Sequence, residues 1–143
     1  MYLGQLLKSV SKDYQKIKVS GISFDSRKVK KNNIFFAIKG NQLSGIKFIN
    51  EAILKGASAI ITNEKLQYKN LSIPLIFVKN ARKTLSEACS NFYKKKPTNI
   101  IAVTGTNGKS SVAGFFYQIL NLNKISSASI GTLGIFSKNY NKK

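Results

Sequence analysis

The residues best suited to chemistry form the segment VTGTNGKSS, residues 103–111. Gly105 and Gly108 allow the backbone to turn tightly and to bring N–H groups close to an anion. A helix that follows such a turn points the positive end of its dipole at the same anion. Lys109 can neutralise phosphate charge, and the hydroxyl of Ser110 can bind Mg²⁺. This spacing predicts a phosphate-binding loop.

The segment departs from the common phosphate-binding loop at one position. The common phosphate-binding loop has another glycine five residues before its Gly-Lys pair, and here that position is Val103. The alternative interpretation is a glycine turn that binds no ligand. That alternative leaves Lys109 unexplained, because a cation beside a helix N-terminus is unfavourable unless an anion is present. Ser111 follows as a further donor or metal ligand.

The segments before residue 97 alternate between strand and helix patterns. Short apolar runs predict strands, and apolar residues at helical spacing predict helices. The second helix begins at Asn80, which is suited to cap its N-terminus, and Cys89 lies on its apolar stripe as a small core residue. The expected strands cover residues 17–25, 33–40, 57–62 and 73–79, and the expected helices cover residues 45–56 and 80–96.

A second unit begins after Pro97. Residues 99–103 are uninterruptedly apolar, which is typical of a parallel strand covered on both faces. The following helix has Val112, Phe115, Phe116, Ile119 and Leu120 at the spacing of one face, which is expected to pack on a sheet. Another strand is expected within residues 125–134. The sequence therefore predicts an α/β protein, with a small α/β domain at 1–96 and a β-loop-α-β unit starting a parallel-sheet domain at 97–143.

Composition narrows the functional classes. The formal net charge of +19 invites a nucleic-acid interpretation, but Arg27 and Arg82 are the only arginines among 24 basic residues, and base recognition favours arginine. A solvated lysine-rich surface is the preferred interpretation. Histidine is absent, which excludes imidazole catalysis and histidine metal ligation. No secretory signal or membrane span is evident, so we expect a cytoplasmic monomer without nucleic-acid or membrane partners.

The combination of motifs resembles the Mur ligase family. VTGTNGKSS is similar to that family's ATP-binding signature, which also lacks the first glycine. Upstream, the segments FDSRKV and FFAIKG resemble the family's amino-terminal UDP-binding domain. Downstream, SIGTLG, residues 129–134, resembles the branch that adds the third amino acid of the muropeptide. The resemblance covers the chain from about residue 21 onward.

The resemblance implies ligand-binding residues, ATP and Mg²⁺ as cofactors, and no catalytic residue within this chain. The implied substrates are UDP-MurNAc-L-Ala-D-Glu and an amino acid, either diaminopimelate or lysine. Asn41 departs from the histidine frequent in the family. Asp25 and Arg27 could instead pair locally and brace their loop. The implied ATP-binding residues are Gly105, Thr106, Asn107, Gly108, Lys109, Ser110 and Ser111, with Ser110 also on the metal, and the implied UDP-muropeptide contacts are Phe24, Ser26, Asn41, Gln42 and Leu43.

No aspartate or glutamate follows Glu87. Phosphate-loop enzymes ordinarily need a carboxylate to complete the Mg²⁺ shell. We therefore expect this chain to be an inactive amino-terminal portion of a longer ligase, with a UDP-muropeptide-binding domain at residues 1–96 and a truncated ATP-binding domain at 97–143. The alternatives are a ligase of the D-Ala-D-Ala-adding branch or of the folylpolyglutamate type, and a non-enzymatic nucleic-acid-binding protein.

Overall fold

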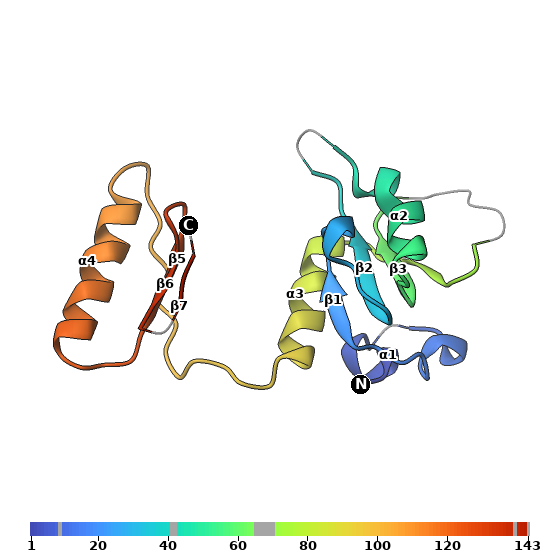
Figure 1. Ribbon diagram of the computed structural model, residues 1–143, viewed down its shortest axis with the longest axis horizontal. Coiled ribbons are helices and arrows are strands. Elements are labelled where there is room, and N and C mark those ends of the chain that lie inside the picture. The colour runs from blue at the N-terminus through green and yellow to red at the C-terminus, as the bar shows by residue number, and fades with distance from the viewer. Residues whose placement is uncertain (9, 41–42, 65–70, 139, 143) are drawn as a thin grey trace. The chain divides into compact units, whose positions relative to one another are not determined.

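The computed structural model describes residues 1–8, 10–40, 43–64, 71–138 and 140–142 (Figure 1). Its contacts divide the chain into two compact units, Met1–Lys96 and Pro97–Lys143. Helices combine with a parallel sheet, which confirms the predicted α/β class. Within the described residues, no helix combines the length and apolar character that crossing a membrane requires.

The first unit is built on a four-stranded parallel sheet whose strands lie side by side in chain order. Ile34 on the second strand lies opposite Ile22 of the first strand and Ala59 of the third strand. Parallel neighbours require crossover connections. The first crossover contains η2 (Ser26–Lys28), and the second contains η3 (Gly45–Phe48) and α2 (Ile49–Leu54). The strands are β1 (Gly21–Ser23), β2 (Asn33–Ala37), β3 (Ala59–Thr62) and β4 (Leu75–Phe77).

Alternating side chains of the sheet form two cores. Ile34 and Phe36 of β2 pack with α1 (Leu3–Leu6) and α3 (Ala81–Phe92) on one face. Phe35 and Ala37 belong to the opposite core, which includes α2 (Ile49–Leu54). All five residues of β2 are buried, as expected of a central parallel strand covered on both sides.

The predicted helices and strands of this unit are confirmed with shorter bounds. The strand expected at residues 17–25 is limited to β1, and the helix expected at 45–56 divides into the 3₁₀ helix η3 (Gly45–Phe48) and α2. The side chain of Asn80 accepts a hydrogen bond from the backbone N–H of Lys83 and caps α3 as predicted. Cys89 is half-buried rather than fully buried, and burial raises the pKa of its thiol. The remaining 3₁₀ helices are η1 (Lys12–Tyr14) and η2 (Ser26–Lys28).

The described residues of the second unit form one helix and an antiparallel sheet of three strands in chain order. Thr132 and Leu133 form the two-residue connection between the first two strands, where Gly131 lies opposite Gly134. None of the side chains described between residues 97 and 138 is buried. The elements are α4 (Lys109–Leu122), β5 (Ala128–Gly131), β6 (Gly134–Ser137) and β7 (Tyr140–Lys142).

Two details of the second unit differ from the sequence-based expectation. The structure assigns no strand to residues 99–103, where Ile100 and Ile101 are exposed, and β5 pairs with β6 in an antiparallel hairpin. An apolar run forms a strand only where another strand offers hydrogen bonds, and none pairs with this run in the described part of the unit. The expected packing face of α4 is also solvent-exposed, since Phe115 is 62% exposed and Ile119 is 54% exposed.

Candidate functional site

The predicted phosphate-binding loop leads directly into α4 and lies at the surface. Gly105 has a φ of 148° and Gly108 a φ of 74°, conformations that other residues rarely adopt. Gly108 is also the N-cap residue of α4. A Cβ atom at Gly108 would meet no atom within 4 Å, so backbone conformation rather than lack of space accounts for the glycine.

Lys109 is the first residue of α4, and its side chain folds back over the loop. Its Nζ donates to the carbonyl oxygens of Gly105, at 2.5 Å, and Thr106, at 3.0 Å. The ammonium group therefore lies beside the loop backbone, where the helix dipole favours negative charge. A phosphate bound in this loop would accept hydrogen bonds from Lys109 and from the N-terminus of α4. Thr106, Asn107 and Ser111 are exposed around the same loop.

Ser110 lies opposite a residue that sequence reasoning did not select. Its Oγ atom is 3.1 Å from Oγ1 of Thr132, in the connection between β5 and β6. Both residues line a small hollow of about 60 Å³ between α4 and these strands. Thr132 lies within the SIGTLG segment used for the family resemblance, but a threonine in a turn gives no signal of a contact 22 residues away. Two hydroxyl oxygens are hard donors of the kind that Mg²⁺ accepts.

The residues expected to contact a UDP-sugar follow β1 and β2. Because these strands are parallel, the loops after them meet at one edge of the sheet, where ligands of parallel sheets ordinarily bind. Phe24 is 70% exposed and Leu43 is 56% exposed, so both side chains are accessible to a ligand. Asn41 and Gln42 lie outside the described residues.

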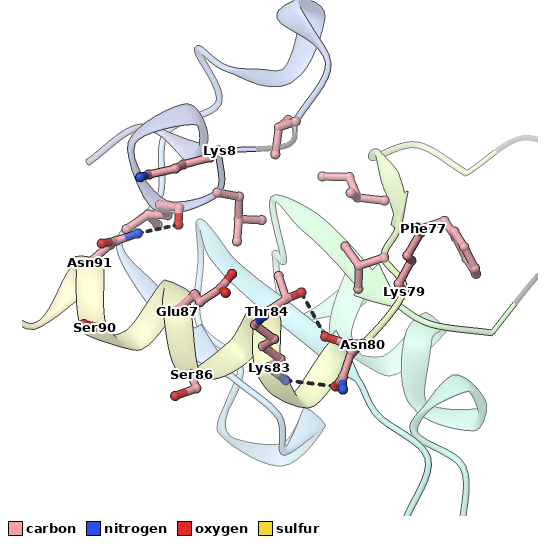
Figure 2. A pocket seen from close by; sticks show the side chains of 15 residues that line it. Lys8, Phe77, Lys79, Asn80, Lys83, Thr84, Ser86, Glu87, Ser90 and Asn91 are labelled. Atoms are coloured by element: carbon pink, nitrogen blue, oxygen red, sulfur yellow. Dashed lines mark hydrogen bonds between the residues drawn. The ribbon is translucent and has the colours of Figure 1, made fainter.

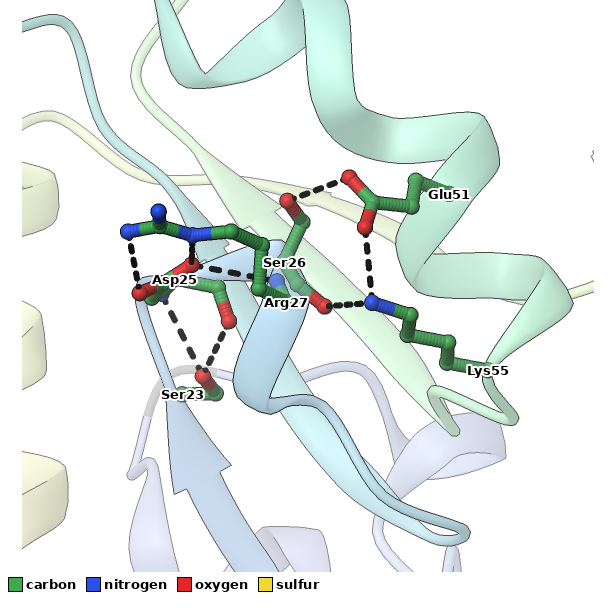
Figure 3. Close-up of polar contacts among 6 residues, drawn as sticks. All are labelled: Ser23, Asp25, Ser26, Arg27, Glu51 and Lys55. Carbon is green, nitrogen blue, oxygen red and sulfur yellow. Dashed lines mark hydrogen bonds and ion pairs between the residues drawn. The ribbon is translucent and has the colours of Figure 1, made fainter.

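Ser26 differs from these exposed residues, because only 5% of it is accessible to solvent. Its Oγ atom donates a 2.6 Å hydrogen bond to Oε2 of Glu51 on α2 (Figure 3). The ammonium group of Lys55 bonds both to Oε1 of Glu51, at 2.7 Å, and to the carbonyl oxygen of Ser26, at 3.3 Å. The loop after β1 is therefore tied to α2 by polar contacts. Sequence reasoning missed Glu51 and Lys55.

The predicted local pairing of Asp25 with Arg27 is present. The guanidinium Nε and Nη2 atoms of Arg27 each donate a 3.0 Å hydrogen bond to the carboxylate of Asp25 (Figure 3). The same carboxylate accepts the backbone N–H of Arg27. The side-chain bond to Arg27 lowers the pKa of Asp25, and the contacts of Glu51 with Lys55 and Ser26 likewise lower the pKa of Glu51.

These lowered pKa values predict how stability depends on pH. Both carboxylates stabilise the fold above their ordinary pKa and lose that contribution as pH falls through the lowered values. We expect the urea midpoint to be flat near neutral pH and to fall below about pH 4. The double variant Asp25→Asn/Glu51→Gln should show a smaller acid-induced fall than the control Asp13→Asn/Glu87→Gln. An identical fall in both would contradict this assignment.

The segment after β2 is held by contacts from the segment after β3 and from α3. Lys39 and Ser44 form an isolated antiparallel bridge. The hydroxyl of Ser44 donates a 2.8 Å hydrogen bond to Oε1 of Glu64, which follows β3. Arg82, at the start of α3, donates to the carbonyl oxygen of Lys39 at 3.2 Å. Arg27 and Arg82, the only arginines, thus both lie in segments that follow strands of the sheet.

A hollow of the first unit lies elsewhere, between α1, β4 and α3 (Figure 2). Its volume is about 890 Å³, and Lys8, Lys79 and Lys83 contribute to its lining. None of the described residues predicted to bind a UDP-sugar lines it. Figure 2 shows polar side chains of α3 along this hollow, including Asn91, whose Nδ2 atom donates to the carbonyl oxygen of Leu6 at 2.9 Å.

Comparison with known proteins identifies the family of the chain. A family model described as "Mur ligase family, catalytic domain" matches residues 18–93, just over half of the chain. The chain belongs to the Mur ligase family. The match includes the sheet of the first unit and the loops after its strands, which confirms the expected resemblance for this part of the chain.

Curated Mur ligases similar to this chain have a consistent name. A protein of Rickettsia montanensis is 48% identical over 123 residues, covering 85% of this chain and 25% of that protein. A protein of Clostridioides difficile is 43% identical, covering 84% of this chain and 25% of that protein. Both are named UDP-N-acetylmuramoyl-L-alanyl-D-glutamate–2,6-diaminopimelate ligase. The chain spans about a quarter of the length of these relatives.

Solved Mur ligase structures have a similar fold. A solved structure of a UDP-N-acetylmuramoyl-L-alanyl-D-glutamate–2,6-diaminopimelate ligase matches 99% of this chain over 30% of its own length, at 25% identity and a TM-score of 0.77. A MurF ligase from Thermotoga maritima, solved in complex with ADP, matches 73% of this chain and 24% of its own, at 30% identity and a TM-score of 0.58.

Proposed function

We propose that this chain supplies the UDP-muropeptide-binding and ATP-binding parts of a ligase of peptidoglycan precursor synthesis. In the proposed reaction, ATP transfers its γ-phosphoryl group to a carboxylate of UDP-MurNAc-L-Ala-D-Glu and leaves as ADP. The amine of an incoming amino acid then displaces phosphate from the acyl phosphate and loses a proton as the amide forms. The reaction replaces a poor leaving group by phosphate before the amide forms. A cytoplasmic location and a monomeric state are part of the proposal.

The phosphate-binding loop is the observation that carries this proposal. Gly105 and Gly108 have backbone conformations suited to a tight anion-binding turn, and α4 begins at the end of that turn. Lys109 already bonds to the loop backbone and needs only a side-chain rearrangement to reach a bound phosphate. We assign the segment from Gly105 to Ser111 to ATP. The role of these residues is to hold and orient the phosphates while charge develops on the transferred group.

We assign the hydroxyl of Ser110 to Mg²⁺, with Thr132 as a neighbouring oxygen donor. Their 3.1 Å separation and their exposure suit a hard cation that retains several waters. When bound, the ion would neutralise phosphate charge. Apart from these hydroxyls, no group of three or more acidic, cysteine or histidine side chains suited to a metal occurs among the residues that the structure describes.

We assign the loops after β1 and β2 to the UDP-muropeptide, through Phe24, Ser26 and the segment 41–43. The exposed ring of Phe24 is suited to stack on a uracil ring, and an aromatic ring in such a contact contributes roughly 1–3 kcal/mol. Diaminopimelate is the favoured incoming amino acid because the curated relatives are named for it. The similarity to MurF ligases keeps D-Ala-D-Ala addition as the second candidate.

The proposal is tested by the binding of UDP-MurNAc-L-Ala-D-Glu to the chain, measured by calorimetry. We expect Phe24→Ala to weaken this binding by roughly tenfold, which corresponds to the loss of one stacking contact. The melting temperature should be unchanged, because Phe24 is exposed. The control Phe77→Ala removes an exposed ring from β4 and should bind normally. Binding of the ligand to neither the chain nor its control would refute the assignment of this edge of the sheet.

A further inference from the structure

Acidic side chains are scarce in this protein, with five aspartates and glutamates against 24 lysines and arginines. In such a chain, a carboxylate can pair with many neighbouring cations. Glu51 pairs with Lys55 and also accepts a hydrogen bond from the hydroxyl of Ser26, a residue 25 positions earlier that is almost fully buried. The contact joins α2 to the loop that we assign to the UDP-muropeptide (Figure 3).

The geometry constrains both ends of this contact. Lys55 lies one helical turn after Glu51 and holds its second carboxylate oxygen at 2.7 Å. The same ammonium group reaches the carbonyl oxygen of Ser26, so the hydroxyl and the carbonyl of one residue are both held from α2. Hydrogen bonds to charged groups are shorter and stronger than neutral ones, and the 2.6 Å separation of Ser26 Oγ and Glu51 Oε2 agrees with that class.

We propose that Glu51 is a positioning residue of the UDP-muropeptide site, an inference that rests on the function proposed above. Glu51 fixes the loop after β1 and determines whether the Ser26 hydroxyl can donate or accept a hydrogen bond with a ligand. A serine hydroxyl can donate one hydrogen bond, and here it donates that bond to Glu51. The oxygen of Ser26 can then only accept a hydrogen bond from a ligand. The ligand group at this position is therefore a donor, such as the imide N–H of uracil or a ribose hydroxyl.

The position of α2 does not depend on this contact. Ile49 and Ala52 are fully buried in the core on this face of the sheet, and they hold the helix independently of its polar side chains. The side chain of Glu51 is 39% exposed, so a leucine at this position leaves no buried cavity. Replacement of Glu51 should therefore disturb the loop without unfolding the unit.

The test compares Glu51→Leu with Glu87→Leu, a matched loss of one carboxylate from the exposed surface of α3. Calorimetry should show that Glu51→Leu weakens the binding of UDP-MurNAc-L-Ala-D-Glu by roughly tenfold or more, as expected for loss of a hydrogen bond to a charged group. MgATP binding should be unchanged. Glu51→Gln retains an acceptor for Ser26 and should bind within about threefold of the wild type. Ser26→Ala/Glu51→Leu should bind no more weakly than Ser26→Ala alone, because Glu51 acts on the site through the hydroxyl of Ser26.

Hydrogen exchange supplies a measurement that needs no ligand. The N–H of Val29 donates to the carbonyl oxygen of Ser26, and its exchange should accelerate in Glu51→Leu but not in Glu87→Leu. Unchanged exchange at Val29, or equal ligand affinities for Glu51→Leu and Glu87→Leu, would overturn the proposal for Glu51. Absence of binding to the wild-type chain would instead refute the proposed function, and the exchange measurement distinguishes the two failures.

Discussion

Replacement of Lys109 by alanine is expected to weaken MgATP binding by the chain by roughly tenfold to a hundredfold, the loss typical of a charged hydrogen-bond donor. The side chain lies against the loop carbonyls of Gly105 and Thr106, within reach of a phosphate in the turn. Arginine at this position should not restore affinity, because the planar guanidinium group differs in shape from a compact ammonium group.

Calorimetric titration with MgATP provides the measurement. Lys95→Ala removes the same charge from the exposed segment before Pro97 and serves as the control. Equal losses for Lys109→Ala and Lys95→Ala would show that the effect is general electrostatic attraction by a basic protein. That result would contradict a specific phosphate-binding loop.

Replacement of Phe36 by alanine is expected to destabilise the first unit by about 3–5 kcal/mol, the usual loss for a buried phenylalanine in a core. Phe36 lies in β2 and is fully buried, so its removal leaves a cavity between the sheet and the helices α1 and α3. Small domains have a total stability of roughly 5–15 kcal/mol, and the variant should therefore lose a large part of it.

Urea unfolding followed by circular dichroism measures this effect. The control is Phe115→Ala, which removes the same ring from the exposed surface of α4. We expect the control to unfold at the same urea concentration as the wild type. A comparable shift for both variants would mean that the second unit contributes a core of its own, contrary to the exposure of its side chains.

The sequence predicted the first unit well and the second unit less well, for a physical reason. Residues 33–37 and 99–103 are both largely apolar runs of strand length, yet only the first is a strand. An apolar run indicates that burial is favourable, but a strand also needs neighbouring strands that supply hydrogen bonds. Such neighbours flank β2 on both sides, and sequence periodicity does not contain this information.

In the candidate sites too, features formed by residues close in sequence could be predicted, whereas contacts between residues far apart in sequence could not. The turn at the loop glycines, the position of Lys109 and the Asp25–Arg27 pair each involve residues close together in the sequence. The types and spacing of these residues therefore indicate such features directly. The contact between Ser26 and Glu51 and that between Ser110 and Thr132 span more than 20 residues. A single glutamate on a short helix is typical of a solvent-exposed position, so only the fold could identify it.

The internal bonds of Lys109 have a consequence for the rate of the proposed nucleotide binding. The ammonium group is already paired with two carbonyl oxygens, and a phosphate would have to compete for it with the protein's own backbone. Association of the proposed nucleotide would then be an exchange of hydrogen-bond partners. The two carbonyl bonds hold the cation at the loop, at the cost of a side-chain rearrangement on binding.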